Sequence, residues 1–168
     1  AALIAEPIQG VGGFAIPPDG FFGPVEKVCR EHDILFISDE VQTGWGRTGE
    51  HFWGYQAHGI TPDLLTFAKG LGNGLTIAGV VGRAEVMDAV PANSISTFGG
   101  NPLSSAGALA NLRYLLDHGL QANAAVMGDR LLAGLEPLVE RHPAIAEIRG
   151  RGLMIGLELV AADGFTPD

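Results

Sequence analysis

Lys69 and Asp39 are the two residues whose positions in the chain best suit chemistry. Lys69 is one of only two lysines, and it stands between an apolar strand-like run and the glycine-dense segment 70–74. A lysine withdrawn from water loses its proton readily and becomes a nucleophile that forms Schiff bases with carbonyl compounds. The other lysine, Lys27, lies among alternating charges that fit a solvated helix face. Lys69 is therefore the candidate nucleophile.

Asp39 ends a second apolar run and leads into the glycine-punctuated segment 41–49. Ligands bind at the carboxyl ends of strands in open α/β sheets, so Asp39 and Lys69 would present an acid and an amine at one edge. Pyridoxal phosphate uses such a pair, because it needs a lysine for covalent attachment and commonly an Asp at its ring nitrogen. Two plainer interpretations stay open here: a loop cap by Asp39 beside a solvated Glu40, and a structural Asp–Lys ion pair.

Other glycine-rich and aromatic segments also allow more than one interpretation. Segment 70–74 is too compact for a dinucleotide-binding G-x-G-x-x-G motif and fits better a turn that reverses the lysine's strand. Segment 94–102 precedes a predicted helix, and its hydroxyls and glycine amides could hold a phosphate, although an ordinary N-cap explains it equally well. The aromatic side chains of residues 45–55 indicate packing beneath a loop more often than a substrate wall.

The composition disfavours several classes of protein. Nineteen acidic against ten basic residues give a net charge of −9, which repels nucleic acids and anionic membrane surfaces. The single Cys29 excludes an intrachain disulfide framework and fits a reducing compartment. No apolar run reaches the roughly 18 residues of a membrane helix. We expect a cytoplasmic protein, unless an organelle-targeting peptide precedes residue 1, and we expect the sequence to be an internal piece of a larger chain.

Short apolar runs alternate with longer amphipathic ones, which predicts an α/β protein with a mostly parallel sheet. After about residue 118 the pattern becomes helix-rich and then strand-rich. This change predicts a large domain over residues 1–118 and the start of a smaller C-terminal domain over residues 119–168. The expected strands are 3–5, 34–37, 64–68, 76–81, 145–149 and 153–159, and the expected helices are 21–32, 103–118 and 120–141.

Four segments resemble, in order, the signature segments of class III pyridoxal-phosphate aminotransferases. They are EPIQG (6–10), DEVQTGWGRTG (39–49), FAKGLGNG (67–74) and STFGGNP (96–102). A fifth segment, GRGLMIG (150–156), extends the likeness over nearly the whole chain. The resemblance implies the PLP-dependent transferase fold of type I, in which a large α/β domain with a mostly parallel sheet adjoins a smaller α+β domain.

The resemblance also implies which residues contact the ring of the cofactor. Lys69 matches the Schiff-base lysine, which also moves the proton between the substrate α-carbon and the cofactor. Asp39 matches the partner of the pyridine nitrogen. Val41 matches the residue that packs on the ring face, and Gln42 matches the group that hydrogen-bonds the phenolic oxygen.

The remaining matched residues imply a shared site and hence an oligomer. Thr97 matches the hydroxyl that reaches the phosphate of the neighbouring subunit, and Ser96 adjoins it. Glu6 matches a carboxylate that lines the site near the aspartate. The shared phosphate site implies a homodimer or a higher homo-oligomer. By the same resemblance, the phosphate loop and the arginine that binds the substrate carboxylate are expected outside residues 1–168.

Segments 6–14 and 51–54 look most like the alanine–glyoxylate aminotransferase 2 branch of the family. Ornithine and 4-aminobutyrate aminotransferases carry an acidic residue where Val11 stands, and Val11 cannot form the ion pair that this residue makes. The implied reaction moves an amino group from an amino acid such as alanine to a 2-oxo acid such as glyoxylate or pyruvate by ping-pong chemistry. The alternatives are another class III enzyme (an ω-amino acid aminotransferase, aminomutase, decarboxylase or racemase) or a non-catalytic domain of the same fold.

Overall fold

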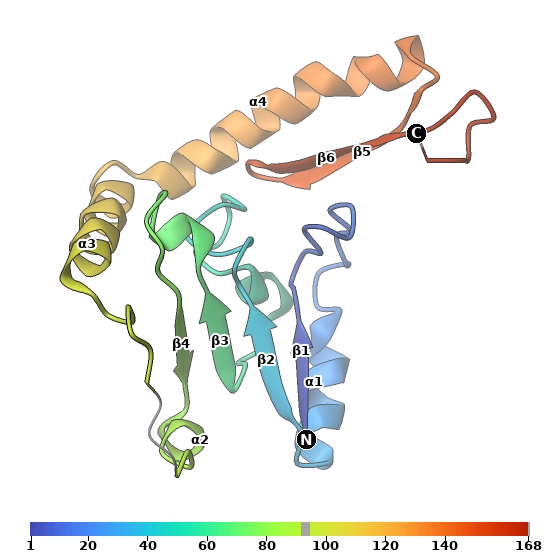
Figure 1. Ribbon diagram of the computed structural model, residues 1–168. Coiled ribbons are helices and arrows are strands. Elements are labelled where there is room, and N and C mark those ends of the chain that lie inside the picture. The colour runs from blue at the N-terminus through green and yellow to red at the C-terminus, as the bar shows by residue number, and fades with distance from the viewer. Residues whose placement is uncertain (92–94, 168) are drawn as a thin grey trace.

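A four-stranded sheet forms the first part of the protein, in a computed structural model that describes residues 1–91 and 95–167 (Figure 1). The strand order is β1-β2-β3-β4, with the first three strands parallel and β4 antiparallel at the edge. The prediction of a mostly parallel α/β sheet is therefore confirmed. The strands are β1 (Ala2–Ala5), β2 (Leu35–Asp39), β3 (Leu64–Phe67) and β4 (Gly79–Gly82).

Helix α1 (Phe22–Glu31) covers one face of this sheet and forms the main core with it. Phe22 packs edge-to-face on Phe36 of β2, with 5.7 Å between the ring centroids. Phe36 and Ser38 are buried, whereas the residues between and beside them are half-buried. Side chains alternate across a strand, so Asp39 faces the side opposite these two residues. The alternation places the candidate acid away from the α1 core.

Strand β4 lies further along the chain than the predicted strand 76–81. Leu75 N donates to Gly72 O at 3.0 Å, so the glycine turn continues through Leu75 before the chain extends. Pairing with β3 begins only at Gly79, which lies opposite Phe67. The boundary is therefore set by the end of β3 at Phe67, because residues 76–78 extend past it without a strand residue opposite them. The helix predicted over 120–141 agrees with the structure at both ends, and the ends of the other predicted strands and helices lie within two residues of the observed ones.

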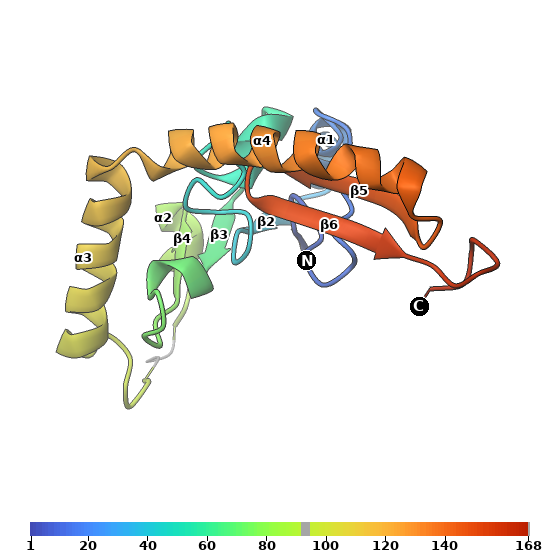
Figure 2. The ribbon, with the colours of Figure 1, turned by 90° about the horizontal axis from the view of Figure 1, so that it is seen from above.

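Two long helices and a hairpin form the rest of the chain. Helix α4 lies along the β5–β6 hairpin, and both lie over the carboxyl ends of the parallel strands (Figures 1 and 2). The helix approaches closely because Gly128 has no side chain: a Cβ there would lie 2.1 Å from Gly152 O. The bounds are α3 (Pro102–Asp117), α4 (Leu120–Arg141), β5 (Ile145–Arg151) and β6 (Met154–Leu159).

Shorter helices complete the described chain: η1 (Gly54–His58), η2 (Lys69–Leu71) and α2 (Ala84–Met87). Gly119 separates α3 from α4 in a left-handed conformation, with φ of 59°. Its N–H bonds to Leu116 O at 3.2 Å, so it caps the first helix. Within the described residues, none of the helices combines the length and apolarity needed to cross a bilayer.

Candidate active site

Asp39 and Lys69 lie at the same edge of the sheet, as predicted. The register of β2 and β3 sets Asp39 opposite Thr66, three residues before Lys69. Glu40 N donates to Thr66 O at 2.9 Å, which continues the ladder one residue past Asp39. Lys69 then opens the short helix η2 directly after β3. Two neighbouring parallel strands therefore deliver the acid and the amine to one place.

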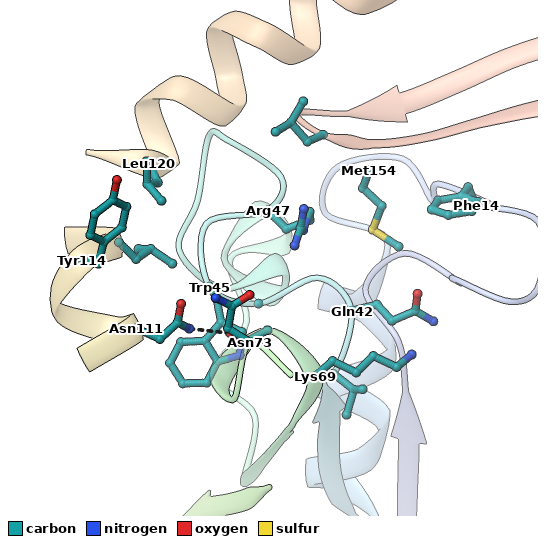
Figure 3. A pocket seen from close by; sticks show the side chains of 15 residues that line it. Phe14, Gln42, Trp45, Arg47, Lys69, Asn73, Asn111, Tyr114, Leu120 and Met154 are labelled. Atoms are coloured by element: carbon teal, nitrogen blue, oxygen red, sulfur yellow. Dashed lines mark hydrogen bonds between the residues drawn. The ribbon is translucent and has the colours of Figure 1, made fainter. Parts of the chain in front are cut away.

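Val41, Gln42 and Lys69 line one cavity of about 520 Å³ between the sheet edge and the C-terminal elements (Figure 3). This volume falls within the range of small-molecule sites, about 300–1,000 Å³. Arg47 and Met154 line the same cavity, the latter from β6. The other lining residues are Phe14, Gly44, Trp45, Gly70, Asn73, Asn111, Tyr114, Leu115, Leu120 and Leu153.

Asp39 and Glu6 line a second hollow of about 460 Å³, beside β1. Asp39 Oδ1 accepts a hydrogen bond from Val41 N at 3.1 Å, so the carboxylate does cap the start of the loop. Its Oδ2 has no hydrogen bond within the described part of the chain. Glu6 Oε2 accepts from Gly10 N at 3.0 Å and so holds the loop that follows β1.

Gln42 rests on the backbone of Gly10. A Cβ at Gly10 would lie 2.0 Å from Gln42 Nε2, so only glycine leaves room for this side chain. In residues 1–91 and 95–167 the Gln42 amide has no hydrogen-bond partner. Two buried atoms nearby also lack one: Trp45 Nε1, whose ring packs on Gly70, and Thr66 Oγ1 opposite Asp39. The unpartnered Gln42 amide, which lines the cavity with Lys69, fits the polar groups of pyridoxal phosphate.

The backbone of Lys69 is held in an unusual conformation. Its φ is 32°, in the left-handed region that residues other than glycine rarely adopt. Such a conformation costs about 1–3 kcal/mol and clusters at functional sites. Two hydrogen bonds close the turn, from Leu71 N to Ala68 O at 2.9 Å and from Gly72 N to Lys69 O at 3.1 Å. The Lys69 side chain itself is exposed to solvent in this chain.

The family model "Aminotransferase class-III" matches residues 1–166. The chain belongs to this family. An alanine/serine racemase of Pyrococcus horikoshii is 42% identical over 164 residues, which are 98% of this chain and 34% of the racemase. An alanine–glyoxylate aminotransferase 2 homologue of Arabidopsis thaliana is 43% identical over 162 residues, 96% of this chain and 34% of that protein.

A solved ornithine aminotransferase of Toxoplasma gondii, with PLP at partial occupancy in its active site, superposes with a TM-score of 0.89. It is 40% identical, and the match covers 95% of this chain and 38% of that one. The resemblance carried by the four sequence segments is thus confirmed, as are the fold of the PLP-dependent aminotransferases and the cofactor class. The class III chain spans between a third and two fifths of the length of these relatives.

Glu40 is not solvated, contrary to one interpretation of the sequence of this class III chain. Its side chain is 0% exposed and each carboxylate oxygen accepts two hydrogen bonds. Oε1 accepts from Ser38 Oγ at 3.1 Å and Tyr55 N at 2.8 Å, and Oε2 accepts from Thr43 Oγ1 at 2.6 Å and Gly54 N at 2.8 Å. Glu40 therefore fixes the loop that carries Val41 and Gln42. The sequence offered one sign of this role: Glu40 directly follows Asp39, the residue that ends an apolar strand.

The aromatic residues of the 45–55 loop do pack beneath it, as expected. Trp45 contacts Trp53 at a centroid distance of 4.8 Å and Phe67 of β3 at 5.3 Å. Tyr55 is not part of this cluster and packs instead on the α1 core. Trp45 also lines the cavity, so the cluster joins the loop of this class III chain to the strand before Lys69.

Ser96 and Thr97 lie apart from the cavity. Both are exposed in the loop before α3. Asn101 Oδ1 accepts from Ser104 N at 2.9 Å, so an ordinary N-cap starts the helix. Phosphate binding by Ser96 and Thr97 stays a prediction. Ser94, at the start of the predicted phosphate segment, is outside the described residues.

Proposed function

We propose that the full-length protein containing this chain is a pyridoxal-phosphate-dependent aminotransferase. It moves an amino group from an amino acid such as alanine to a 2-oxo acid such as glyoxylate or pyruvate. The observation that carries the proposal is the delivery of Lys69 and Asp39 to one sheet edge, beside Val41 and Gln42. Membership of the class III family supports the same reaction type.

The residues have distinct tasks in this reaction. Pyridoxal phosphate supplies the electron sink that stabilises the carbanion formed when a bond to the amino-acid α-carbon breaks. The negative charge of Asp39 would keep the ring nitrogen protonated, Val41 would pack on the ring face, and Gln42 would donate to the phenolic oxygen. Lys69 Nζ would hold the cofactor covalently, and its free amine would take the α-proton of the substrate and return a proton to the cofactor.

The most specific part of the proposal is that alanine is the amino donor. Val11 is 93% exposed and carries no charge, so it cannot make the ion pair that ω-amino substrates would need there. The Arabidopsis relative is named for alanine and glyoxylate. A second candidate is amino-acid racemisation, because the Pyrococcus relative is named as an alanine/serine racemase. Racemisation would use Lys69 and Asp39 in the same places but release no 2-oxo acid.

The assembly and the location of the protein are proposed on the same basis. We assign residues 1–118 to the large cofactor-binding domain and residues 119–168 to the start of the small one; Asp168 is outside the described residues. Ser96 and Thr97 would reach the phosphate of a neighbouring subunit, so the active unit would be a homodimer or larger. The net charge of −9 and the single cysteine support a cytoplasmic enzyme that binds neither nucleic acid nor membrane.

The test is the first half-reaction of the full-length protein loaded with pyridoxal phosphate. L-alanine alone should yield about one pyruvate per active site, and glyoxylate added afterwards should yield glycine. D-alanine without pyruvate would establish the racemase instead. Lys69→Ala should abolish product, whereas Lys27→Ala, which removes the chain's other lysine from an exposed helix face, should leave it unchanged. Pyruvate formation by the Lys69→Ala protein at the normal rate would refute the proposal.

A further inference from the structure

Asn111 of helix α3 is bonded directly to the turn that carries Lys69. Its Nδ2 donates to Gly70 O at 2.7 Å (Figure 3) and to Leu71 O at 3.1 Å, across about forty residues of sequence. An amide nitrogen has two hydrogens, so both are used. The two carbonyls that follow Lys69 are thereby held by one side chain from outside the turn.

Gly107, four residues earlier, lies on the same face of α3. A Cβ at Gly107 would lie 2.2 Å from Leu75 Cδ1, so the missing side chain lets Leu75 pack against the helix backbone. The helix therefore contacts both ends of the turn formed by residues 69–75. Asn111 is also the only amide side chain within α3, whose other central residues are mostly alanine and leucine.

The turn needs such support because Lys69 is strained. A left-handed φ of 32° at a residue with a Cβ persists only when surrounding contacts hold it. The turn's own two closing bonds fix its amides, and Asn111 fixes its carbonyls. Neither a leucine nor an aspartate at position 111 could donate to two carbonyls.

We propose that Asn111 is a positioning residue, which fixes the strained turn and so aims Lys69 Nζ at the carbonyl carbon that it attacks. The inference rests on the proposed function of Lys69. Because α3 begins directly after the loop containing Thr97, the same helix links the lysine turn to the loop proposed to reach the neighbouring subunit.

The experiment measures how fast full-length cofactor-free protein captures pyridoxal phosphate at Lys69, followed by absorbance after rapid mixing. Asn111→Leu and Asn111→Asp should each slow capture about tenfold, as expected from losing hydrogen bonds at partly buried carbonyls. The matched controls are Asn123→Leu and Asn123→Asp on the exposed face of α4, which make the same changes of size and charge and should capture at the normal rate.

Hydrogen exchange of the same proteins without cofactor separates positioning from general destabilisation. In the Asn111 variants the amides of Leu71 and Gly72 should exchange about tenfold faster, while those of β2 and β3 keep their protection. Normal capture by Asn111→Leu, or an equal loss of protection throughout the sheet, would overturn the inference. If the unmodified protein captures no cofactor, the proposed function fails, and the exchange data still decide whether Asn111 holds the turn.

Discussion

Replacing Glu40 should destabilise the protein by an amount that the hydrogen-bond geometry sets. Each carboxylate oxygen accepts one bond from a backbone amide and one from a hydroxyl. Hydroxyls rotate to find other acceptors, but the amides of Gly54 and Tyr55 are fixed by the chain. A buried donor left without a partner costs about 1–3 kcal/mol, so Glu40→Ala should cost about 2–6 kcal/mol.

Glu40→Gln should lower the free energy of unfolding by an intermediate amount. The glutamine oxygen can accept from only one of the two amides, and its NH₂ group must face the other. We therefore expect a loss of about 1–3 kcal/mol, whichever way the amide is turned. Glu31→Gln is the control, because Glu31 is exposed and makes only a 3.9 Å ion pair with Lys27. Its effect should stay below about 0.5 kcal/mol.

Urea unfolding of the full-length proteins, followed by fluorescence, gives the differences in free energy from the midpoints and slopes. We predict that the loss of free energy of unfolding increases in the order Glu31→Gln, Glu40→Gln, Glu40→Ala. If Glu40→Ala costs less than about 1 kcal/mol, the four bonds do not hold the loop and the reasoning fails.

Three further predictions follow from the same structure. Gly128→Ala should destabilise by about 1–3 kcal/mol in thermal unfolding, because its Cβ would meet backbone of the hairpin, whereas Gly134→Ala in the same helix meets nothing and should stabilise by up to about 1 kcal/mol. Gly10→Ala should displace Gln42 and weaken equilibrium binding of pyridoxal phosphate about tenfold; unchanged binding would exclude Gln42 as a ring contact. Burial holds the pKa of His58 below its ordinary 6.5, so the unfolded chain binds the proton more tightly; urea midpoints should fall as the pH drops from 6.5 through this lower pKa, and His58→Gln should flatten that dependence.

The meeting of Asp39 and Lys69 at one sheet edge could be predicted, because the sequence signals for both strand ends lie within a few residues of each. An apolar run that ends in Asp39 and another that ends at Lys69 predict two strands and the meeting of their ends. The proposed ring contacts came from short motifs within a few residues of these two. The family resemblance then placed Val41 and Gln42, which the structure brings to one cavity with Lys69.

The supporting residues could not be predicted because their partners are distant in sequence. The amides that bind Glu40 come from residues 54 and 55, and Asn111 bonds to a turn about forty residues earlier. Only the fold brings these atoms together. The start of β4 was misplaced by three residues, because β3 ends at Phe67, opposite Gly79, and residues 76–78 have no strand residue to pair with.

The most direct test of the proposed cofactor site is to find where pyridoxal phosphate attaches. The full-length protein would be loaded with pyridoxal phosphate, reduced with borohydride, digested and sequenced by mass spectrometry. We predict a pyridoxyl group on Lys69 and none on Lys27. A protein that retains no pyridoxyl group, or carries it elsewhere while Lys69 stays unmodified, would contradict the central claim.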